Sequence, residues 1–318
     1  MIDASRRSTD GAKSDLSGWP ALVLTAGLAT RLQPLSRVRA KAALPVAGEA
    51  LVLRILRSLR AAGVTRAVLN LHHRADTITR EVGDGAALGM SVRYSWETEV
   101  LGSAGGPARA LPLLEADRFL IVNGDTLATV DLAALAAQHV DTSALVTMAV
   151  VDGDPKYNGI LADEAGRVRG FGREPGAFHF IGVQAVNAAA FAGVSPARRS
   201  ETVHGMYPDL IAQWPDHLRV MPTAAEFFDI GTPRDYLETA LKLAAREGRP
   251  PGRGHGCEVS PDAELRDTIL WNEVTIGAGA SLNRCVVADH VRVPAGAQHV
   301  ECSLVMGDNG LVADPFRN

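Results

Sequence analysis

The chain has 318 residues, which is enough for about two domains of ordinary size. Apolar residues make up 47% of it and charged residues 21%, a composition that excludes an intrinsically disordered protein. With 32 Lys and Arg against 36 Asp and Glu, the net charge is −4, so we expect neither nucleic acid nor an anionic membrane as a partner.

Residues 1–18 predict a disordered N-terminal tail, because they combine charged, Ser and Gly residues with no apolar run of the kind that a secretory signal needs. No stretch of the chain has the ~18 consecutive apolar residues of a membrane-spanning helix. The three cysteines lack metal-binding or disulfide-framework spacing, which favours a reducing compartment. We therefore expect a cytoplasmic protein without membrane contact.

From residue 19 onward, short apolar runs alternate with amphipathic segments. The apolar runs predict strands buried on both faces, and the amphipathic segments predict helices. Helices are expected at 50–62, 75–82 and 131–139, and strands at 21–24, 64–71, 91–95, 119–122 and 144–151. This alternation indicates an α/β layer with a mainly parallel sheet, in which ligands bind beyond the carboxyl ends of strands.

The last helix of the first domain is predicted to begin at Thr232-Pro233, because Thr is a favourable N-cap and Pro suits the first helical position. We expect it to end near Arg246. The Gly- and Pro-rich stretch 248–256 predicts a linker, which bounds the first domain at 19–247.

Beyond the linker, apolar residues recur every 17 residues, as Val259, Ile276 and Val293 illustrate. A coil of three six-residue sides has about 18 residues, so this period is typical of a hexapeptide β-helix. We predict about three coils of a short β-helix over residues 257–310, followed by a tail at 311–318.

The loop at residues 25–31, T-A-G-L-A-T-R, follows the first predicted strand. Its small residues let backbone N–H groups approach a phosphate, and Arg31 and Lys41 add positive charge. The loop lacks the glycine spacing of a dinucleotide-binding fingerprint, which disfavours a dehydrogenase, and it lacks the G-K-[ST] ending of a P-loop. Taken alone, the loop is explained equally well as an ordinary strand-to-helix turn with two solvated cations.

With this loop the chain resembles the sugar-1-phosphate nucleotidylyltransferases, also called NDP-sugar pyrophosphorylases. Their signature is roughly L-A-A-G-x-G-T-R-L-x-P-L-T, then P-K-P-L-x-P-V; this chain has L-T-A-G-L-A-T-R-L-Q-P-L-S, then A-K-A-A-L-P-V. Ala29 replaces the second glycine, and Ala40 and Ala42 replace the prolines that flank Lys41. A Cβ at position 29 would crowd a triphosphate or require an unusual backbone angle.

Four later segments resemble further motifs of the family in the same order. They are Gly102-Ser103-Ala104-Gly105 (G-T-A-G, nucleoside), Asn123-Gly124-Asp125 (N-G-D), Phe180-Ile181-Gly182-Val183 (F-T-G-I, sugar) and Phe228-Asp229-Ile230-Gly231-Thr232 (W-x-D-I-G-T). The resemblance covers about residues 20–310. It implies an α/β fold: a Rossmann-like nucleotidyltransferase domain with a mixed, mainly parallel sheet, followed by a short left-handed β-helix.

The resemblance implies the chemistry as well. An oxygen of a sugar 1-phosphate attacks the α-phosphorus of an NTP, and pyrophosphate leaves in line. Because the nucleophile is already an anion, no general base is required, and catalysis consists of positioning and charge neutralisation. Arg31 would hold the leaving phosphates, and Lys41 the α-phosphate and the incoming phosphate. The implied catalytic residues are Arg31, Lys41 and Asp125.

Asp125 and Asp229 would together hold one Mg²⁺, an ion that takes one or two carboxylates plus phosphate and water oxygens. Without the resemblance, Asp125 is more simply a turn residue, and Asp229 an acceptor near a helix N-terminus. The implied nucleotide-binding residues are Ala26, Gly27, Thr30, Arg31, Glu97, Gly102, Ser103 and Asn123.

The sugar site is implied at Gly159, Gly182, Arg173 and Glu174. Where the family has E-K-P, this chain has Arg173-Glu174-Pro175, with acid and base in the opposite order. Glu174 would bind a sugar hydroxyl and Arg173 would replace the lysine that holds the sugar phosphate. A solvated charged pair is an equally weighted interpretation.

Glu97 and Glu99 precede the Gly102 loop, and a carboxylate can accept the two adjacent donors of guanine. This favours GTP, although solvent-exposed glutamates are the simpler alternative. Family members that this chain resembles at F-x-G-I are often mannose-1-phosphate guanylyltransferases, and this resemblance implies mannose 1-phosphate as the acceptor. Because the first 150 residues also resemble N-acetylmuramate-1-phosphate uridylyltransferases, uridylyl or thymidylyl transfer is an alternative activity.

Two other functions stay open. The altered residues Ala29 and Arg173 fit a weakly active regulatory homologue that binds a nucleotide sugar. A β-helix can also carry a second, acyl-transfer activity, but His255, His290 and His299 have no recognisable partner. We expect the β-helix instead to form contacts in a homo-oligomer.

Overall fold

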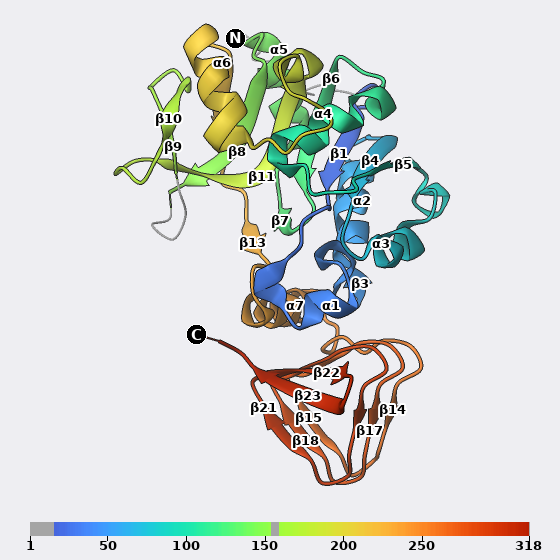
Figure 1. Ribbon diagram of the computed structural model, residues 1–318. Coiled ribbons are helices and arrows are strands. Elements are labelled where there is room, and N and C mark those ends of the chain that lie inside the picture. Colours follow the sequence, from blue (N-terminus) through green and yellow to red (C-terminus); the bar gives the residue numbers. More distant parts are fainter. Residues whose placement is uncertain (1–15, 154–158, 318) are drawn as a thin grey trace, which may run out of the picture.

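The computed structural model describes residues 16–153 and 159–317. An α/β domain lies above a β-helix in Figure 1. Most of the tail predicted at 1–18 lies outside the described residues. Its last part is not a tail, because Leu16 is fully buried in the hydrophobic core of the α/β domain.

A mixed sheet forms the centre of the α/β domain. Its strands lie in the order β12-β8-β11-β6-β1-β4-β5, and β9 and β10 continue from β11. Neighbours along this order are parallel except at β11, which is antiparallel to both β6 and β8. The mixed, mainly parallel sheet is therefore confirmed. The strands are β1 (Ala21–Leu24), β4 (Arg66–Leu71), β5 (Ser91–Trp96), β6 (Arg118–Asn123), β8 (Val146–Asp152), β9 (Gly159–Ala162), β10 (Val168–Gly172), β11 (Phe178–Asn187) and β12 (Leu218–Pro222).

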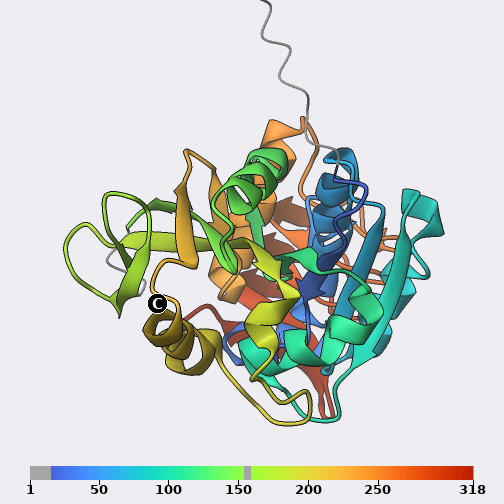
Figure 2. The same ribbon diagram turned by 90° about the horizontal axis from the view of Figure 1, so that it is seen from above.

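Helices cover both faces of this sheet, as the view from above shows (Figure 2). Val23 packs in the cluster that includes α2, α3 and α5, whereas its neighbour Leu22 packs with α4 and α6. This division follows from the two-residue period of a strand. The helices are α1 (Leu35–Val38), α2 (Leu51–Ala61), α3 (Ala75–Val82), α4 (Gly102–Leu114), α5 (Leu132–Asp141), α6 (Tyr207–Gln213) and α7 (Pro233–Arg246).

The predicted helices at 50–62, 75–82 and 131–139 are confirmed as α2, α3 and α5. The predicted start of α7 is also confirmed, because the Thr232 side chain accepts a hydrogen bond from the Asp235 backbone N–H. Helix α4 was not expected, since it begins in a glycine-rich loop and contains two prolines.

Two short antiparallel pairs complete the α/β domain. Strand β2 (Pro45–Val46) pairs with β3 (Glu49–Ala50), and β7 (Thr126–Ala128) pairs with β13 (Phe227–Asp229). The second pair joins segments that are about a hundred residues apart in the sequence. It brings the end of β13 beside the turn that follows β6.

The predicted β-helix is present, and its coils stack with the expected period. Val259 pairs with Ile276, and Ile276 pairs with Val293, in parallel register. Each of the three sides is a stack of parallel strands. The first side consists of β14 (Glu258–Val259), β17 (Thr275–Ile276) and β20 (Arg292–Val293), and the second of β15 (Glu264–Arg266), β18 (Ser281–Asn283) and β21 (Gln298–Val300). The third side consists of β16 (Ile269–Leu270), β19 (Val286–Val287) and β22 (Cys302–Gly307).

The tail predicted at 311–318 needs a correction. Residues Gly310–Pro315 form strand β23, which runs antiparallel to β22 and adds a fourth strand to that side of the β-helix. The two strands form a hairpin that ends the β-helix, so the chain turns back on the last coil instead of leaving it.

Helices α7 and α1 lie between the α/β domain and the β-helix (Figure 1). Charged pairs cross this junction, among them Arg39 with Asp289 and Glu238 with Arg284. Among residues 16–153 and 159–317, every helix is too short or too polar to cross a membrane.

Candidate active site

The loops after β1 and β6 meet at the carboxyl ends of these two neighbouring strands. The Gly124 N–H donates to the Leu24 carbonyl at 2.9 Å, and a Cβ on Gly124 would lie only 2.6 Å from that oxygen. Only glycine allows so close an approach. The two loops enclose a pocket of about 370 Å³.

Several of the predicted site residues line this pocket. They are Gly27, Thr30, Arg31, Lys41 and Asp125. Ala26 is a buried residue of the loop after β1, and Asn123 ends strand β6 one residue before Gly124. The structure thus brings together the loop and the catalytic side chains that sequence motifs suggested.

Ala29 occupies a left-handed backbone conformation at the edge of the pocket, with φ 48° and ψ 47°. Its backbone carbonyl accepts a hydrogen bond from the Leu32 N–H at 3.0 Å, and Leu32 is buried in the core. A non-glycine residue in this region carries about 1–3 kcal/mol of strain. Of the two outcomes expected for a Cβ at this position, the unusual backbone angle is the one that the structure adopts.

Lys41 and Asp125 form an ion pair inside the pocket. The distance from Lys41 Nζ to Asp125 Oδ2 is 2.9 Å. The lysine side chain is 11% exposed, whereas the aspartate side chain is 46% exposed. The lysine is therefore held in place by protein, and its charged end meets a carboxylate that faces the pocket.

Asp229 lies beside Asp125 because of the pairing of β13 with β7. In this antiparallel pair Asp229 is directly opposite Thr126, the residue after Asp125. Directly opposed residues in an antiparallel pair have Cβ atoms about 4.5–5.5 Å apart. The pairing therefore places Asp229 next to the turn that carries Asp125, although the two residues are about a hundred positions apart in the sequence.

Arg31 reaches the same place from the loop after β1. A Cβ built on Gly231 would lie 3.2 Å from Arg31 Nη2 and 3.3 Å from Asp229 Oδ2. Both side chains therefore pack over Gly231, and any larger residue there would push them apart. Arg31, Lys41 and the two aspartates form one cluster of two cations and two carboxylates.

This cluster fits a hard divalent cation that takes only part of its ligands from protein. Asp125 and Asp229 supply the carboxylate oxygens that such an ion prefers. In the described part of the chain, no group of three or more His, Cys, Asp or Glu side chains is arranged to hold a metal. Further ligands at this site would come from phosphate oxygens and water.

Glu97, which was expected to read the base, is buried and hydrogen-bonded to protein groups. The side chain is buried, with 5% of the residue exposed. Its Oε1 accepts from the Asn70 side chain at 2.7 Å, and its Oε2 accepts from the Leu101 N–H at 2.8 Å. Asn70 in turn accepts from the Thr25 N–H at 2.7 Å. Glu97 therefore connects the segments around the pocket through hydrogen bonds. Glu99, in contrast, is exposed.

Gly102 and Ser103 begin helix α4, and their partners are in the protein. The Ser103 hydroxyl donates to Glu201 Oε2 at 2.8 Å and accepts from the Thr202 N–H at 2.8 Å. Burial alone raises the pKa of Glu201, but hydrogen bonds from Ser103 and Arg199 outweigh it, so the pKa lies below its usual value. Neither Gly102 nor Ser103 lines the pocket.

Arg199 is a pocket residue that the sequence motifs did not reveal. It lines the same pocket as Lys41, and its Nε donates to Glu201 Oε1 at 3.1 Å. The neighbouring Ser200 carbonyl accepts from the Ala104 N–H at 2.9 Å, which ties this segment to the start of α4. Two adjacent arginines in a polar loop, Arg198 and Arg199, do not indicate a binding site from the sequence alone. Only the fold therefore identifies Arg199 as a pocket residue.

The predicted sugar residues are only partly brought to this site. Gly182 has φ +82°, and a Cβ there would lie 2.7 Å from Thr126 Oγ1, which places Gly182 against the turn that carries Asp125. Gly159 is buried beside Ala177. Arg173 and Glu174 are exposed between β10 and β11 and do not line the pocket. Tyr157 and Asn158, which precede Gly159 in the segment that resembles the family's Y-G-V motif, lie outside the described residues.

A larger cavity, of about 430 Å³, lies at the junction with the β-helix. Residues of α3, the linker and the first coil line it, including Glu81, Arg253 and Asn272. It contains none of the residues expected to bind nucleotide, sugar or metal. The smaller pocket at the strand ends is therefore the candidate active site.

Comparison with known protein families assigns both parts of the chain. Residues 20–246 match the nucleotidyl transferase family, and residues 254–300 match the GlmU-like C-terminal hexapeptide family. These matches fall on the α/β domain and on the β-helix respectively.

Individual relatives agree with these matches. The mannose-1-phosphate guanylyltransferase of Mycobacterium tuberculosis is 31% identical over 295 residues, which cover 87% of this chain and 81% of the relative. The N-acetylmuramate alpha-1-phosphate uridylyltransferase of Neisseria meningitidis is 42% identical over 115 residues, or 36% of this chain and 50% of the relative. The crystal structure of HddC from Yersinia pseudotuberculosis superposes with a TM-score of 0.61 at 23% identity, over 71% of this chain and 99% of HddC.

Proposed function

The chain belongs to the nucleotidyl transferase family, and from that premise we propose that it transfers a nucleotidyl group from an NTP to a sugar 1-phosphate. GTP is the proposed donor and mannose 1-phosphate the proposed acceptor, and the products are an NDP-sugar and pyrophosphate. The observation that carries the proposal is the Lys41–Asp125 pair, with Asp229 on the adjacent strand and Arg31 beside it.

The choice of GTP and mannose 1-phosphate rests on relatives that match over most of the chain. The mycobacterial enzyme and a rice relative described as a probable mannose-1-phosphate guanylyltransferase each align with at least 86% of this chain. Both alignments extend beyond the α/β domain into the β-helix. The uridylyltransferase of Neisseria is more similar residue by residue, but only over 36% of the chain.

In the proposed reaction an oxygen of the sugar 1-phosphate forms a bond to the α-phosphorus, and the bond from that phosphorus to the bridging oxygen of the β-phosphate breaks. The electron pair leaves with pyrophosphate. Charge is the main obstacle, because two polyanions must approach each other. Arg31 holds the leaving β- and γ-phosphates, and Lys41 holds the α-phosphate and the incoming phosphate in line.

The backbone of residues 26–30 lies against the phosphates in this arrangement, because small side chains leave its N–H groups accessible. Arg199 adds a third cation to the pocket wall. Asp125 orients Lys41 through their ion pair at 2.9 Å. Asp125 and Asp229 are the proposed ligands of Mg²⁺, which when bound neutralises phosphate charge and polarises the α-phosphate.

We propose that the sugar 1-phosphate binds at the part of the site next to β11. Gly182 lies so close to the Asn123–Thr126 turn that a Cβ there would be 2.7 Å from Thr126 Oγ1, which keeps β11 next to the turn that carries Asp125. Gly159, Arg173 and Glu174 are the proposed contacts of the sugar ring and its phosphate from β9 and the loop after β10. The assembly of several copies through the β-helix and a cytoplasmic location stay predictions from the sequence.

The test is a matrix of GTP, UTP, dTTP and ATP against mannose, glucose and N-acetylmuramate 1-phosphates, scored by pyrophosphate release in the presence of Mg²⁺. We expect the highest kcat/KM for GTP with mannose 1-phosphate. A preference for UTP with N-acetylmuramate 1-phosphate would favour uridylyl transfer. Tight binding of a nucleotide sugar with no pyrophosphate release from any pair would favour the regulatory alternative.

A further inference from the structure

The segment at residues 39–45, which carries Lys41, is connected to the β-helix at both of its ends, directly at Arg39 and through α7 at Pro45. At the first end, the Arg39 side chain makes a two-point bond with Asp289, from Nε to Oδ2 and from Nη2 to Oδ1, both at 2.7 Å. Asp289 lies in the β-helix, between β19 and β20. Two parallel bonds of this kind fix orientation as well as distance.

The surroundings of Arg39 hold its side chain in this contact. Only 8% of the residue is exposed, and its guanidinium lies 5.3 Å from the centre of the buried Trp271 ring. Glu81 on α3 lies 3.5 Å from Nη1. Burial alone lowers the pKa of Arg39, but the hydrogen bond and the charges of Asp289 and Glu81 outweigh it and raise the pKa. The side chain is therefore charged and fully paired.

Asp289 is also fixed on its own side. Its Oδ1 accepts a hydrogen bond from the Asn272 backbone N–H at 2.9 Å, one coil earlier in the β-helix. The His290 N–H donates to the Asn272 carbonyl at 3.0 Å, which ties the two coils together at this point. The carboxylate that Arg39 meets is thus part of the rigid stack of coils.

The second end of the segment is held through α7. The Tyr236 hydroxyl donates to the Pro45 carbonyl at 2.6 Å, and it accepts from Trp271 Nε1 at 3.1 Å. Trp271 belongs to the β-helix, and both aromatic side chains are fully buried. Two neighbouring coils of the β-helix, which carry Trp271 and Asp289, therefore support the segment before and after Lys41.

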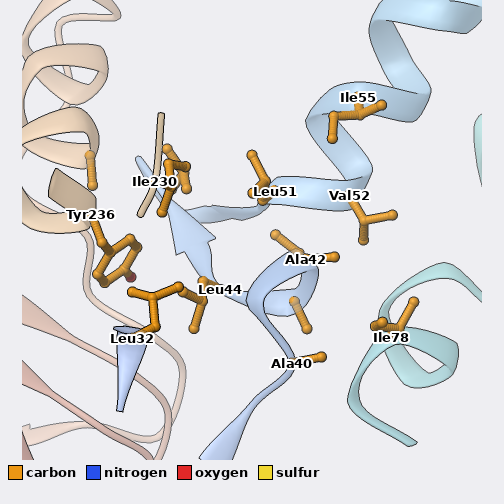
Figure 3. Close-up of a cluster of buried hydrophobic side chains, with 14 of the residues drawn as sticks. Leu32, Ala40, Ala42, Leu44, Leu51, Val52, Ile55, Ile78, Ile230 and Tyr236 are labelled. Atoms are coloured by element: carbon orange, nitrogen blue, oxygen red, sulfur yellow. The ribbon is translucent and has the colours of Figure 1, made fainter. Parts of the chain in front are cut away.

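Between these two ends the segment is packed against the α/β domain. Figure 3 shows Ala40, Ala42 and Leu44 together with side chains of α2, α3 and α7. The Ala40 N–H donates to Thr77 Oγ1 on α3 at 3.1 Å. Lys41 is the residue of this segment whose side chain leaves the core and reaches the pocket, where it meets Asp125.

We infer that the Arg39–Asp289 pair is a positioning contact, through which the β-helix holds Lys41 in place for phosphate transfer. Arg39 and Asp289 do not touch substrate in this account. They restrict the backbone two residues before Lys41, and a displacement of about 1 Å at a reacting group can lower the rate by about 10²-fold. The inference rests on the proposed function, because it assigns Lys41 to the reaction.

The experiment compares Asp289→Asn with Glu238→Gln. Glu238 on α7 pairs with Arg284 of the β-helix at 3.2 Å. The Glu238→Gln substitution therefore breaks another ion pair across the same junction, but it does not alter a contact of the Lys41 segment. We expect Asp289→Asn to lower kcat by about tenfold or more with KM for both substrates changed by less than about threefold. We expect Glu238→Gln to retain wild-type kcat.

A second measurement asks whether the effect passes through Lys41. In a Lys41→Ala background, Asp289→Asn should have almost no further effect on the residual kcat, because the group that it positions is absent. If Asp289→Asn does not fold, Arg39→Lys replaces it, since a lysine keeps the charge but cannot form the two-point bond.

Three outcomes would overturn the inference: an unchanged kcat in Asp289→Asn, an equal loss in Glu238→Gln, or the same fold loss in both Lys41 backgrounds. A wild-type enzyme without turnover would overturn the proposed function instead. In that case amide hydrogen exchange at residues 40–44 still decides the positioning contact: faster exchange in Asp289→Asn than in Glu238→Gln supports it, and equal exchange overturns it.

Discussion

Lys41 and Asp125 are 84 positions apart in the sequence, yet Lys41 Nζ lies 2.9 Å from Asp125 Oδ2 at the centre of the pocket. The pair joins a short turn after α1 to the turn after β6. It places a fixed positive charge beside a carboxylate that remains accessible from the pocket. The first two predictions concern this carboxylate and its neighbour on β13.

Asp125→Ala is expected to lower kcat/KM by about 10³-fold, because it removes both the partner of Lys41 and a proposed metal ligand. The fold should persist, since the loss of a partly exposed ion pair changes the unfolding free energy by only about 1 kcal/mol. Pyrophosphate release and urea unfolding measure the two quantities. Asp141→Asn, at the exposed end of α5, is the control for activity. Near-wild-type turnover in Asp125→Ala would remove Asp125 from the mechanism.

Asp229→Asn is expected to raise the Mg²⁺ concentration needed for half-maximal rate by about tenfold or more, because a neutral amide is a poorer ligand than a carboxylate. The control is Asp235→Asn. Asp235 also lies near Gly231, but its carboxylate accepts from the Thr232 hydroxyl at 2.8 Å at the start of α7. Rates measured over a Mg²⁺ titration should separate the variants, and identical titration curves would contradict the metal assignment.

Ala29→Gly is expected to raise the unfolding free energy by about 1 kcal/mol, because glycine adopts φ 48° without steric strain. Its KM for the NTP should stay at the wild-type value, because the unusual backbone angle already accommodates the Cβ of Ala29. Ala47→Gly is a matched control, since Ala47 has φ 50° but does not line the pocket. It should gain stability with an unchanged KM. Urea unfolding and steady-state kinetics give both values, and a loss of stability in Ala29→Gly would contradict the strain.

Glu97→Gln is expected to lower the unfolding free energy by about 1–3 kcal/mol, because an amide N–H₂ would face a donor on Asn70 or on the Leu101 backbone. Its ratio of kcat/KM for GTP over UTP should stay at the wild-type value. Glu99→Gln, at an exposed position, should change neither quantity. A ratio that falls toward one in Glu97→Gln would restore the base-reading role for this carboxylate.

Acid is expected to destabilise the protein through His139. Burial lowers the pKa of His139 to about 4 from its ordinary value of 6.5, so the unfolded chain takes up a proton before the folded one does. Stability is therefore complete above pH 6.5 and decreases as the pH falls from 6.5 to 4. The loss from this group is on the order of 3 kcal/mol.

Urea unfolding at pH 7, 6, 5 and 4.5 measures this decrease. His139→Gln should flatten the slope, whereas His255→Gln, at an exposed position, should keep it. The same slope in all three proteins would show that other groups cause the acid sensitivity.

Much of the local structure followed from the sequence. Strands β1 and β6, helix α2 and the capped start of α7 were predicted close to their observed bounds, because burial period and capping are properties of neighbouring residues. The same reasoning predicted the register of the β-helix, where each coil repeats the burial pattern of the one before. It missed α4 and β23, since the first contains Gly and Pro and the second is stabilised by a partner strand.

The sequence by itself also indicated the candidate site residues, because Arg31, Lys41, Asp125 and Asp229 lie in segments that resemble the family's motifs and have residue types that suit phosphate and a divalent ion. Only the tertiary structure decided how they are held. The pairing of β13 with β7, the inward-facing Glu97, Arg199 at the pocket and the bond from Arg39 to Asp289 all join segments distant in the chain. Such contacts depend on how strands and coils pack against one another, and no local period or propensity encodes that choice.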